Sequence, residues 1–201
     1  MSELDELYQQ IILDAARERH GEGELAPVEA GAGPATAGRA AGAGALSGPR
    51  GESTQVNPMC GDEVTLEVRL SPDGEKIAEL AWQGQGCSIS QASISIMNDL
   101  VAGQSIEHLA TLYSYFREMM DSRGAELPEA AADALEDAAA FHGVARFPMR
   151  IKCALLGWMA VREATDEALC HLGNSDGQES GSAADDAAED TSQNTKETPE
   201  Q

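Results

Sequence analysis

The segment from Val64 to Trp82 reads VTLEVRLSPDGEKIAELAW. Apolar and polar side chains alternate from Val64 to Leu70, which is the period of a strand with one buried face. Residues 71–74 (SPDG) have the chemistry of a turn, and residues 77–82 are then predicted to return as a second strand. Because two strands alone are marginally stable in water, the rest of the chain has to supply helices that cover their apolar face.

Apolar residues recur at helical spacing in several other parts of the chain. Ser105 is a suitable N-cap, and Pro128 and Pro148 are suited to the first turn of a helix. The expected helices span residues 3–19, 87–103, 106–120, 128–141 and 148–169. These patterns predict an α+β fold in which packed helices cover a small antiparallel β-sheet.

Composition divides the chain into four parts. We expect residues 1–20 to be the N-terminal helix of the domain and residues 57–170 to be its core. Residues 21–56 are rich in Gly and Ala and have no hydrophobic period, which predicts a disordered insertion. Residues 171–201 are acidic and lack aromatic side chains, which predicts a disordered tail.

The net charge argues against a nucleic-acid partner, and the short length of the apolar runs argues against a membrane partner. A formal net charge of −22 argues against nucleic acid, since binding a phosphate backbone needs a basic surface. No apolar run approaches the roughly 20 residues of a membrane helix, and the N-terminal segment is too acidic for a signal peptide. We therefore expect a cytoplasmic protein with no membrane partner. In that reducing compartment, the four cysteines are metal ligands, catalytic thiols or core residues rather than disulfides.

Three cysteines and one aspartate lie at the ends of predicted elements. Cys60 and Asp62 precede the first strand, Cys87 begins a helix, and Cys153 lies near the start of the last helix. Three thiolates and one carboxylate would complete a tetrahedral zinc site. Spacing alone leaves another interpretation open, in which Cys87 and Cys153 are small buried apolar residues and Asp62 binds its own turn.

Four ordered segments together resemble the SufU-type members of the U-type iron–sulfur assembly family, which is related to IscU and to the N-terminal domain of NifU. They span most of residues 4–165, and the Gly/Ala-rich insertion interrupts them. The segments are LYQQIILD (7–14), NPMCGD (57–62), GQGCSIS (84–90) and FPMRIKC (147–153). The resemblance implies the α+β fold of that family.

Within the family, two features resemble the SufU branch rather than the scaffold branch. The scaffold branch has a histidine where this chain has Lys152, and SufU-type proteins share the extra residues found here at about 122–142. The resemblance implies that Cys60, Asp62, Cys87 and Cys153 bind zinc and that Cys60 accepts sulfur. It also implies that Arg150 lies beside the site, where it would offset negative charge or contact a partner carboxylate.

The function that the resemblance implies is zinc-dependent sulfur transfer, with persulfide sulfur accepted from a SufS-type cysteine desulfurase and passed to downstream iron–sulfur assembly proteins. One alternative is a scaffold that assembles a labile iron–sulfur cluster on the same cysteines, because thiolates serve both metals. Another is a zinc site that only stabilises the fold. Cys170 and the four histidines (His20, His108, His142 and His171) have no ligand-like spacing and are expected to lie outside the site.

Overall fold

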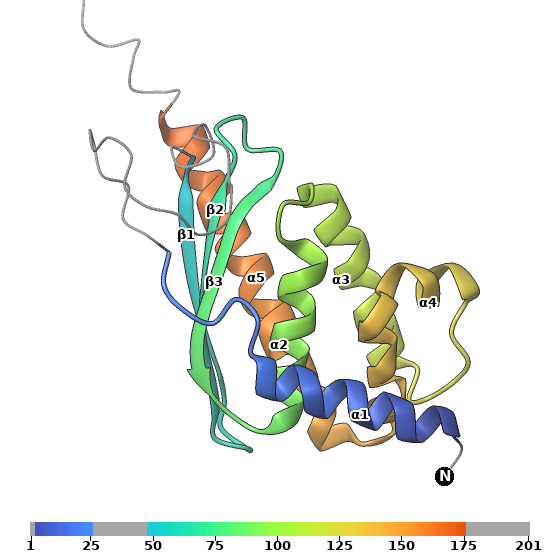
Figure 1. Ribbon diagram of the computed structural model, residues 1–201. Coiled ribbons are helices and arrows are strands. Elements are labelled where there is room, and N and C mark those ends of the chain that lie inside the picture. The colour runs from blue at the N-terminus through green and yellow to red at the C-terminus, as the bar shows by residue number, and fades with distance from the viewer. Residues whose placement is uncertain (1–2, 26–47, 176–201) are drawn as a thin grey trace, which may run out of the picture.

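The computed structural model describes residues 3–25 and 48–175. Three antiparallel strands form a sheet in the order β1-β2-β3, and the helices cover one face of it (Figure 1). The strands are β1 (Arg50–Asn57), β2 (Asp62–Leu70) and β3 (Ile77–Gln85). The helices are α1 (Glu3–Glu18), α2 (Ser88–Val101), α3 (Ile106–Asp121), α4 (Glu129–Leu135), the 3-10 helix η2 (Glu136–Arg146) and α5 (Pro148–Ser175). The predicted fold class is confirmed.

The predicted hairpin forms the central and one outer strand of this sheet. Val64, Leu66 and Val68 of β2 are at most 1% exposed, as their alternation with polar residues indicated. The turn into β3 is closed by Asp73, whose Oδ1 accepts a hydrogen bond from the Glu75 backbone N–H at 3.0 Å. The local sequence therefore determined this hairpin correctly.

Strand β1 lies inside the segment predicted to be a disordered insertion, so that prediction is wrong for residues 50–56. The strand lacks an apolar alternation because helix α5 approaches its backbone too closely for large side chains. A Cβ atom placed on Gly51 would lie 2.0 Å from the backbone oxygen of Ala164. Next along the same face, Ser53 is buried and its hydroxyl donates to the Glu163 carboxylate at 2.7 Å.

The other end of the predicted insertion is also ordered. The Trp82 backbone N–H donates to the Gly21 oxygen at 3.0 Å, and the Gly23 N–H donates to the Trp82 oxygen at 2.9 Å. Residues after helix α1 thus pair with the free edge of β3. The rest of the predicted insertion, residues 26–47, lies outside the described residues.

The helices correct two further boundaries. The predicted helix over 128–141 breaks at Glu136, whose φ of 45° lies in the left-handed region and ends α4 before η2 begins. Helix α5 continues to Ser175, so residues 171–175 are helical rather than part of a disordered tail. The remainder of that tail lies outside the described residues.

Helix α5 organises the core because it packs on β1, β2 and α2. The fully buried Trp158 stacks on Phe116 of α3 with ring centroids 4.7 Å apart, and Phe141 of η2 meets Phe116 edge-on at 5.7 Å. These contacts fix the direction of α5 and therefore the position of its first turns. Across residues 3–25 and 48–175, no helix has the length and apolar character required to cross a membrane.

Candidate metal centre

Three segments that are distant in the sequence meet at one end of the molecule: the β1–β2 turn, the start of α2 and the start of α5 (Figure 1). The turn carries Cys60, strand β2 begins directly after it at Asp62, and the first turns of α5 carry Cys153. The ligand atoms of these three residues all lie within 4.8 Å of one another. The two sulfurs, Cys60 Sγ and Cys153 Sγ, are 3.2 Å apart.

Asp62 connects this group to helix α2. Its side chain is 1% exposed, and its Oδ1 accepts a hydrogen bond from the Cys87 backbone N–H at 2.8 Å. A carboxylate at a helix N-terminus is stabilised by the unpaired N–H groups there. Asp62 therefore joins β2 to α2 through a side-chain hydrogen bond. This arrangement differs from the alternative in which the Asp62 side chain binds the backbone of its own turn.

Cys87 is the N-cap residue of α2 and is exposed. Its Sγ lies 3.4 Å from Asp62 Oδ2, so it borders the group of Cys60, Asp62 and Cys153 through the shared carboxylate. The thiol also lies 3.8 Å from the Ser90 hydroxyl in the first turn of α2. The alternative of a buried apolar residue does not hold for Cys87.

Cys153 is the buried member of the site, with 1% of its surface exposed. Burial raises the pKa of its thiol well above the ordinary value, and the hydrogen bonds with Asp62 and Cys60 and the charge of Cys87 raise it further. These groups would all be negative together if every thiol were ionised. A cation bound among these groups would offset their charge and so allow several of the thiols to be ionised at neutral pH.

The chemistry of the donor set fits zinc. Zinc takes thiolate, imidazole and carboxylate ligands in a tetrahedron, and the residues present supply three sulfurs and one carboxylate. Their combined charge of about −4 would be reduced to about −2 by a divalent ion. A soft, sulfur-rich set of this kind disfavours magnesium and calcium, which prefer oxygen.

Two residues at the site were not recognised in the sequence as functional. Gly86 allows the close approach of α2, since a Cβ atom there would lie 2.5 Å from the Ser90 hydroxyl oxygen and 3.0 Å from Asp62 Oδ1. Asn57, identified in the sequence only as the first residue of the NPMCGD segment, is buried, and its Nδ2 donates to Cys153 Sγ at 3.4 Å. The approach of Gly86 to Asp62 and the contact of Asn57 with Cys153 join residues far apart in the sequence, so local patterns do not encode them.

Arg150 lies on the exposed first turn of α5, three residues before Cys153. Its guanidinium lies over the ring of Phe147, 4.8 Å from the ring centroid. Because residues three positions apart are neighbours on a helix surface, Arg150 and Cys153 lie on adjacent parts of α5. Its predicted role toward the charge of the site or toward a partner stays a prediction.

Cys170 and the four histidines were predicted to lie outside the site, and the structure gives them other positions and contacts. Cys170 is exposed more than four helical turns beyond Cys153 on α5. Three histidines bind other groups: His20 contacts Asp99 at 2.5 Å, His142 contacts the Ala125 oxygen at 2.9 Å, and His171 contacts the Arg50 oxygen at 2.8 Å. His108 lies on the first turn of α3.

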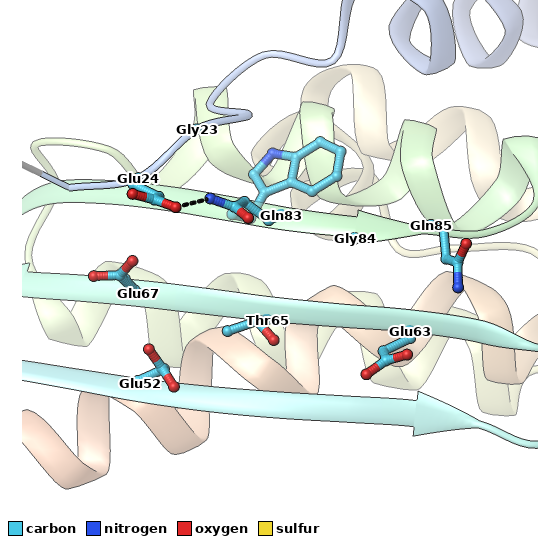
Figure 2. Close-up of a pocket in the computed structure, with 10 residues that line it drawn as sticks. Gly23, Glu24, Glu52, Glu63, Thr65, Glu67, Gln83, Gly84 and Gln85 are labelled. Atoms are coloured by element: carbon cyan, nitrogen blue, oxygen red, sulfur yellow. Dashed lines mark hydrogen bonds between the residues drawn. The ribbon is translucent and has the colours of Figure 1, made fainter.

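A separate hollow of about 490 Å³ lies on the sheet face opposite the helices. Figure 2 shows its carboxylates standing on neighbouring strands, among them Glu52, Glu63 and Glu67. Glu67 is paired with Arg50, and at the edge Glu24 accepts a hydrogen bond from Gln83 at 2.8 Å. This hollow offers no sulfur or imidazole ligand, so it differs in chemistry from the cysteine site.

Residues 8–154 match the NifU-like N terminal domain family, so the chain belongs to that family. IscU of Streptococcus pyogenes serotype M1, an iron–sulfur cluster assembly scaffold protein, is 37% identical over 165 residues, which are 82% of this chain and 86% of that protein. SufU of Bacillus subtilis, a zinc-dependent sulfurtransferase, is 39% identical over 107 residues, which are 53% of this chain and 69% of that protein. The resemblance to the U-type family is confirmed.

Solved structures agree with the fold. The crystal structure of an iron–sulfur cluster assembly scaffold protein for the SUF system from Fervidobacterium islandicum AW-1 is 27% identical with a TM-score of 0.58, and the match covers 78% of this chain and 94% of that one. A NifU-like N-terminal protein from Brucella abortus shares the fold at 23% identity with a TM-score of 0.62, over 84% of this chain and 98% of that one.

Proposed function

We propose that this protein is a zinc-dependent sulfurtransferase that accepts persulfide sulfur from a SufS-type cysteine desulfurase and serves iron–sulfur cluster assembly. The observation that carries the proposal is the convergence of Cys60, Asp62 and Cys153 at one end of the fold, with Cys87 beside Asp62. These are the residues that the family resemblance assigns to zinc. The SufU relative from Bacillus subtilis supports the same activity.

The site is asymmetric in a way that suits sulfur transfer. Cys60 lies in an exposed turn, whereas Cys153 and Asp62 are each 1% exposed. A partner can therefore reach the Cys60 sulfur without entering the core. Cys153 and Asp62 would remain as buried ligands and keep the site intact while Cys60 reacts.

Bound zinc would keep the thiols of the site ionised at neutral pH. The Cys60 thiolate then attacks the terminal sulfur of the partner's persulfide. A new S–S bond forms on Cys60, and the partner's cysteine leaves as a thiolate with the electron pair of the broken S–S bond. We propose that Arg150, which lies three residues before Cys153 on α5, meets an acidic group of the partner.

Two further features favour transfer over cluster assembly. Lys152, where the scaffold branch has a histidine, is exposed and adds no ligand to the site. The extra residues at about 122–142 cover α4 and most of η2, where Phe141 packs on Phe116 of the core. This segment is thus a structural part of the domain that the SufU branch shares.

The test is desulfurase stimulation. Purified protein is added to a SufS-type desulfurase with cysteine, and alanine and sulfide are measured for the wild type, Cys60→Ser and Cys170→Ser. We expect Cys60→Ser to lose the stimulation and Cys170→Ser to keep it, since Cys170 is an exposed thiol remote from the site. Equal stimulation by Cys60→Ser and wild type would remove Cys60 from the mechanism.

The second candidate function is an iron–sulfur scaffold, which the Streptococcus pyogenes relative favours by its name. The same thiolates suit both uses, so the bound metal distinguishes them. Anaerobic purification of a colourless protein with stoichiometric zinc supports sulfur transfer. A brown protein that contains iron and acid-labile sulfide supports the scaffold.

A further inference from the structure

We propose that Asn57 is a positioning residue of the metal centre, whose side-chain amide holds the turn that carries Cys60 against the helix that carries Cys153. The inference rests on the metal site of the proposed function and adds to it a residue that is not a ligand. It concerns how the two sulfurs are oriented toward each other.

The first step of the argument is the burial of the Asn57 amide. Asn57 is the last residue of β1, is 4% exposed, and pairs with Asp62 across the two strands. A buried amide needs partners for both its donor and its acceptor. Nδ2 donates to Cys153 Sγ at 3.4 Å, and Oδ1 accepts from the Met59 backbone N–H at 3.3 Å.

The second step is the turn itself. The Asn57 backbone oxygen accepts hydrogen bonds from the N–H groups of Cys60 at 3.2 Å and Gly61 at 2.9 Å. Gly61 has a φ of 72°, which closes the turn at little steric cost only for glycine. With Met59 N–H on the side chain, three successive N–H groups of the turn therefore bind Asn57.

The third step is that the donor end of the same amide crosses to α5. The contact with Cys153 Sγ spans 96 positions of the sequence and ties the turn to the first turns of that helix. A hydrogen bond to a metal-binding sulfur orients it and withdraws electron density from it. Asn57 thereby makes Cys153 the anchored sulfur and leaves Cys60, at the exposed end of the turn, as the sulfur that can be released.

Three variants separate this role from general support of a turn. Asn57→Asp keeps the shape and the acceptor for Met59 N–H but replaces the donor to Cys153 with an oxygen. Asn57→Ser keeps an acceptor for the turn but is too short to reach Cys153. Asp73→Ala is the matched control. It removes a similar hydrogen bond, in which the Asp73 side chain accepts from the Glu75 N–H, from the turn between β2 and β3.

The readouts need no desulfurase: zinc affinity by competition with a chromophoric chelator, and the thiolate-to-metal absorption bands of the cobalt(II)-loaded protein. We expect both Asn57 variants to bind zinc about tenfold more weakly and to shift the cobalt bands, since outer contacts to metal ligands typically contribute at least this much. Asp73→Ala should match the wild type. If the wild type itself binds no zinc, the metal site of the proposed function is wrong, whatever the variants do.

The remaining outcomes contradict the role of Asn57. Zinc affinity and cobalt bands like those of the wild type in Asn57→Ser would show that the contact with Cys153 contributes nothing, even if Asn57→Asp is weaker or fails to fold. An equal loss in Asp73→Ala would show that any weakened turn has the same effect. In either case the metal site would stand while the positioning role would not.

Discussion

Asp62 Oδ1 accepts a hydrogen bond from the Cys87 backbone N–H at 2.8 Å, which joins the first residue of β2 to the N-cap of α2. The same carboxylate offers Oδ2 to the site, 3.4 Å from Cys87 Sγ. One side chain therefore combines a structural contact with the position of a candidate metal ligand. The two roles can be separated by substitution.

Asp62→Asn keeps an oxygen for the Cys87 N–H but removes the charge, whereas Asp62→Ala removes both. We expect Asp62→Ala to lower the free energy of unfolding of the metal-free protein by about 2 kcal/mol, because it loses a hydrogen bond to a charged group. Asp62→Asn should cost less than half of this. Both should bind zinc much more weakly. Urea unfolding and chelator competition measure the two effects, and equal destabilisation by both variants would show that the hydrogen bond is not what stabilises this junction.

Gly86 is expected to tolerate no larger side chain. A Cβ atom there would lie 2.5 Å from the Ser90 hydroxyl oxygen and 3.0 Å from Asp62 Oδ1. Gly86→Ala should destabilise the protein by about 1–3 kcal/mol, the usual cost of overpacking, and should weaken zinc binding by displacing Asp62. Gly143→Ala is the matched control, since its Cβ would meet nothing within 4 Å. Thermal melts of both variants, with and without zinc, check the prediction, which fails if Gly86→Ala behaves like Gly143→Ala.

The metal-free protein should lose stability in alkaline solution. The pKa of Cys153 is raised in the fold, mainly by burial, so above the ordinary thiol pKa the unfolded chain releases a proton that the folded chain retains. Unfolding is then favoured as pH rises, by at most about 1.4 kcal/mol per pH unit, beginning near pH 8.5. The stabilisation is fully present below that pH.

Urea unfolding at several pH values measures this slope in the metal-free wild type and in Cys153→Ser. The serine variant lacks the titrating thiol, so its alkaline loss should be smaller by the amount that Cys153 contributes. Identical slopes in the two proteins would show that Cys153 is not held as a thiol in the fold.

The surface around Cys60 is expected to contact the desulfurase. Among residues 3–25 and 48–175, eight large apolar side chains are exposed, and half of them lie at the end of β1, in the β1–β2 turn or around the start of α5. These four are Val56, Met59, Phe147 and Met149. We call these four side chains the rim. A partner that delivers sulfur to Cys60 has to cover the rim, and burying these apolar side chains would contribute to binding.

Met59→Gln and Met149→Gln should each raise the concentration needed for half-maximal desulfurase stimulation several-fold, with a tenfold rise corresponding to about 1.4 kcal/mol. Met159→Gln is the matched control, because Met159 is similarly exposed, at 46%, but lies beyond the rim on α5. Maximal stimulation should change little in all three. If Met159→Gln has the same effect as the rim variants, the rim is not the contact surface.

Much of the architecture could be predicted from local patterns. The alternation in β2, the turn at residues 71–74 and the caps of the helices depend on neighbouring residues, so the hairpin and the order of helices were correct. Strand β1 was missed because its inward positions do not face an apolar layer: Gly51 faces the backbone of α5, and Ser53 binds the Glu163 carboxylate of that helix. The break at Glu136 was missed because a left-handed residue in an Ala-rich segment leaves no compositional signal.

By itself, the sequence determined which residues are available for metal chemistry, since the identities and order of Cys60, Asp62, Cys87 and Cys153 are written in it. Only the tertiary structure decided that one sulfur is exposed while another is buried, and that Asn57 contacts the buried one. The physical reason is that burial and hydrogen bonding at this site arise from the packing of α5 on the sheet. That packing brings together groups more than 90 residues apart, which no local pattern records.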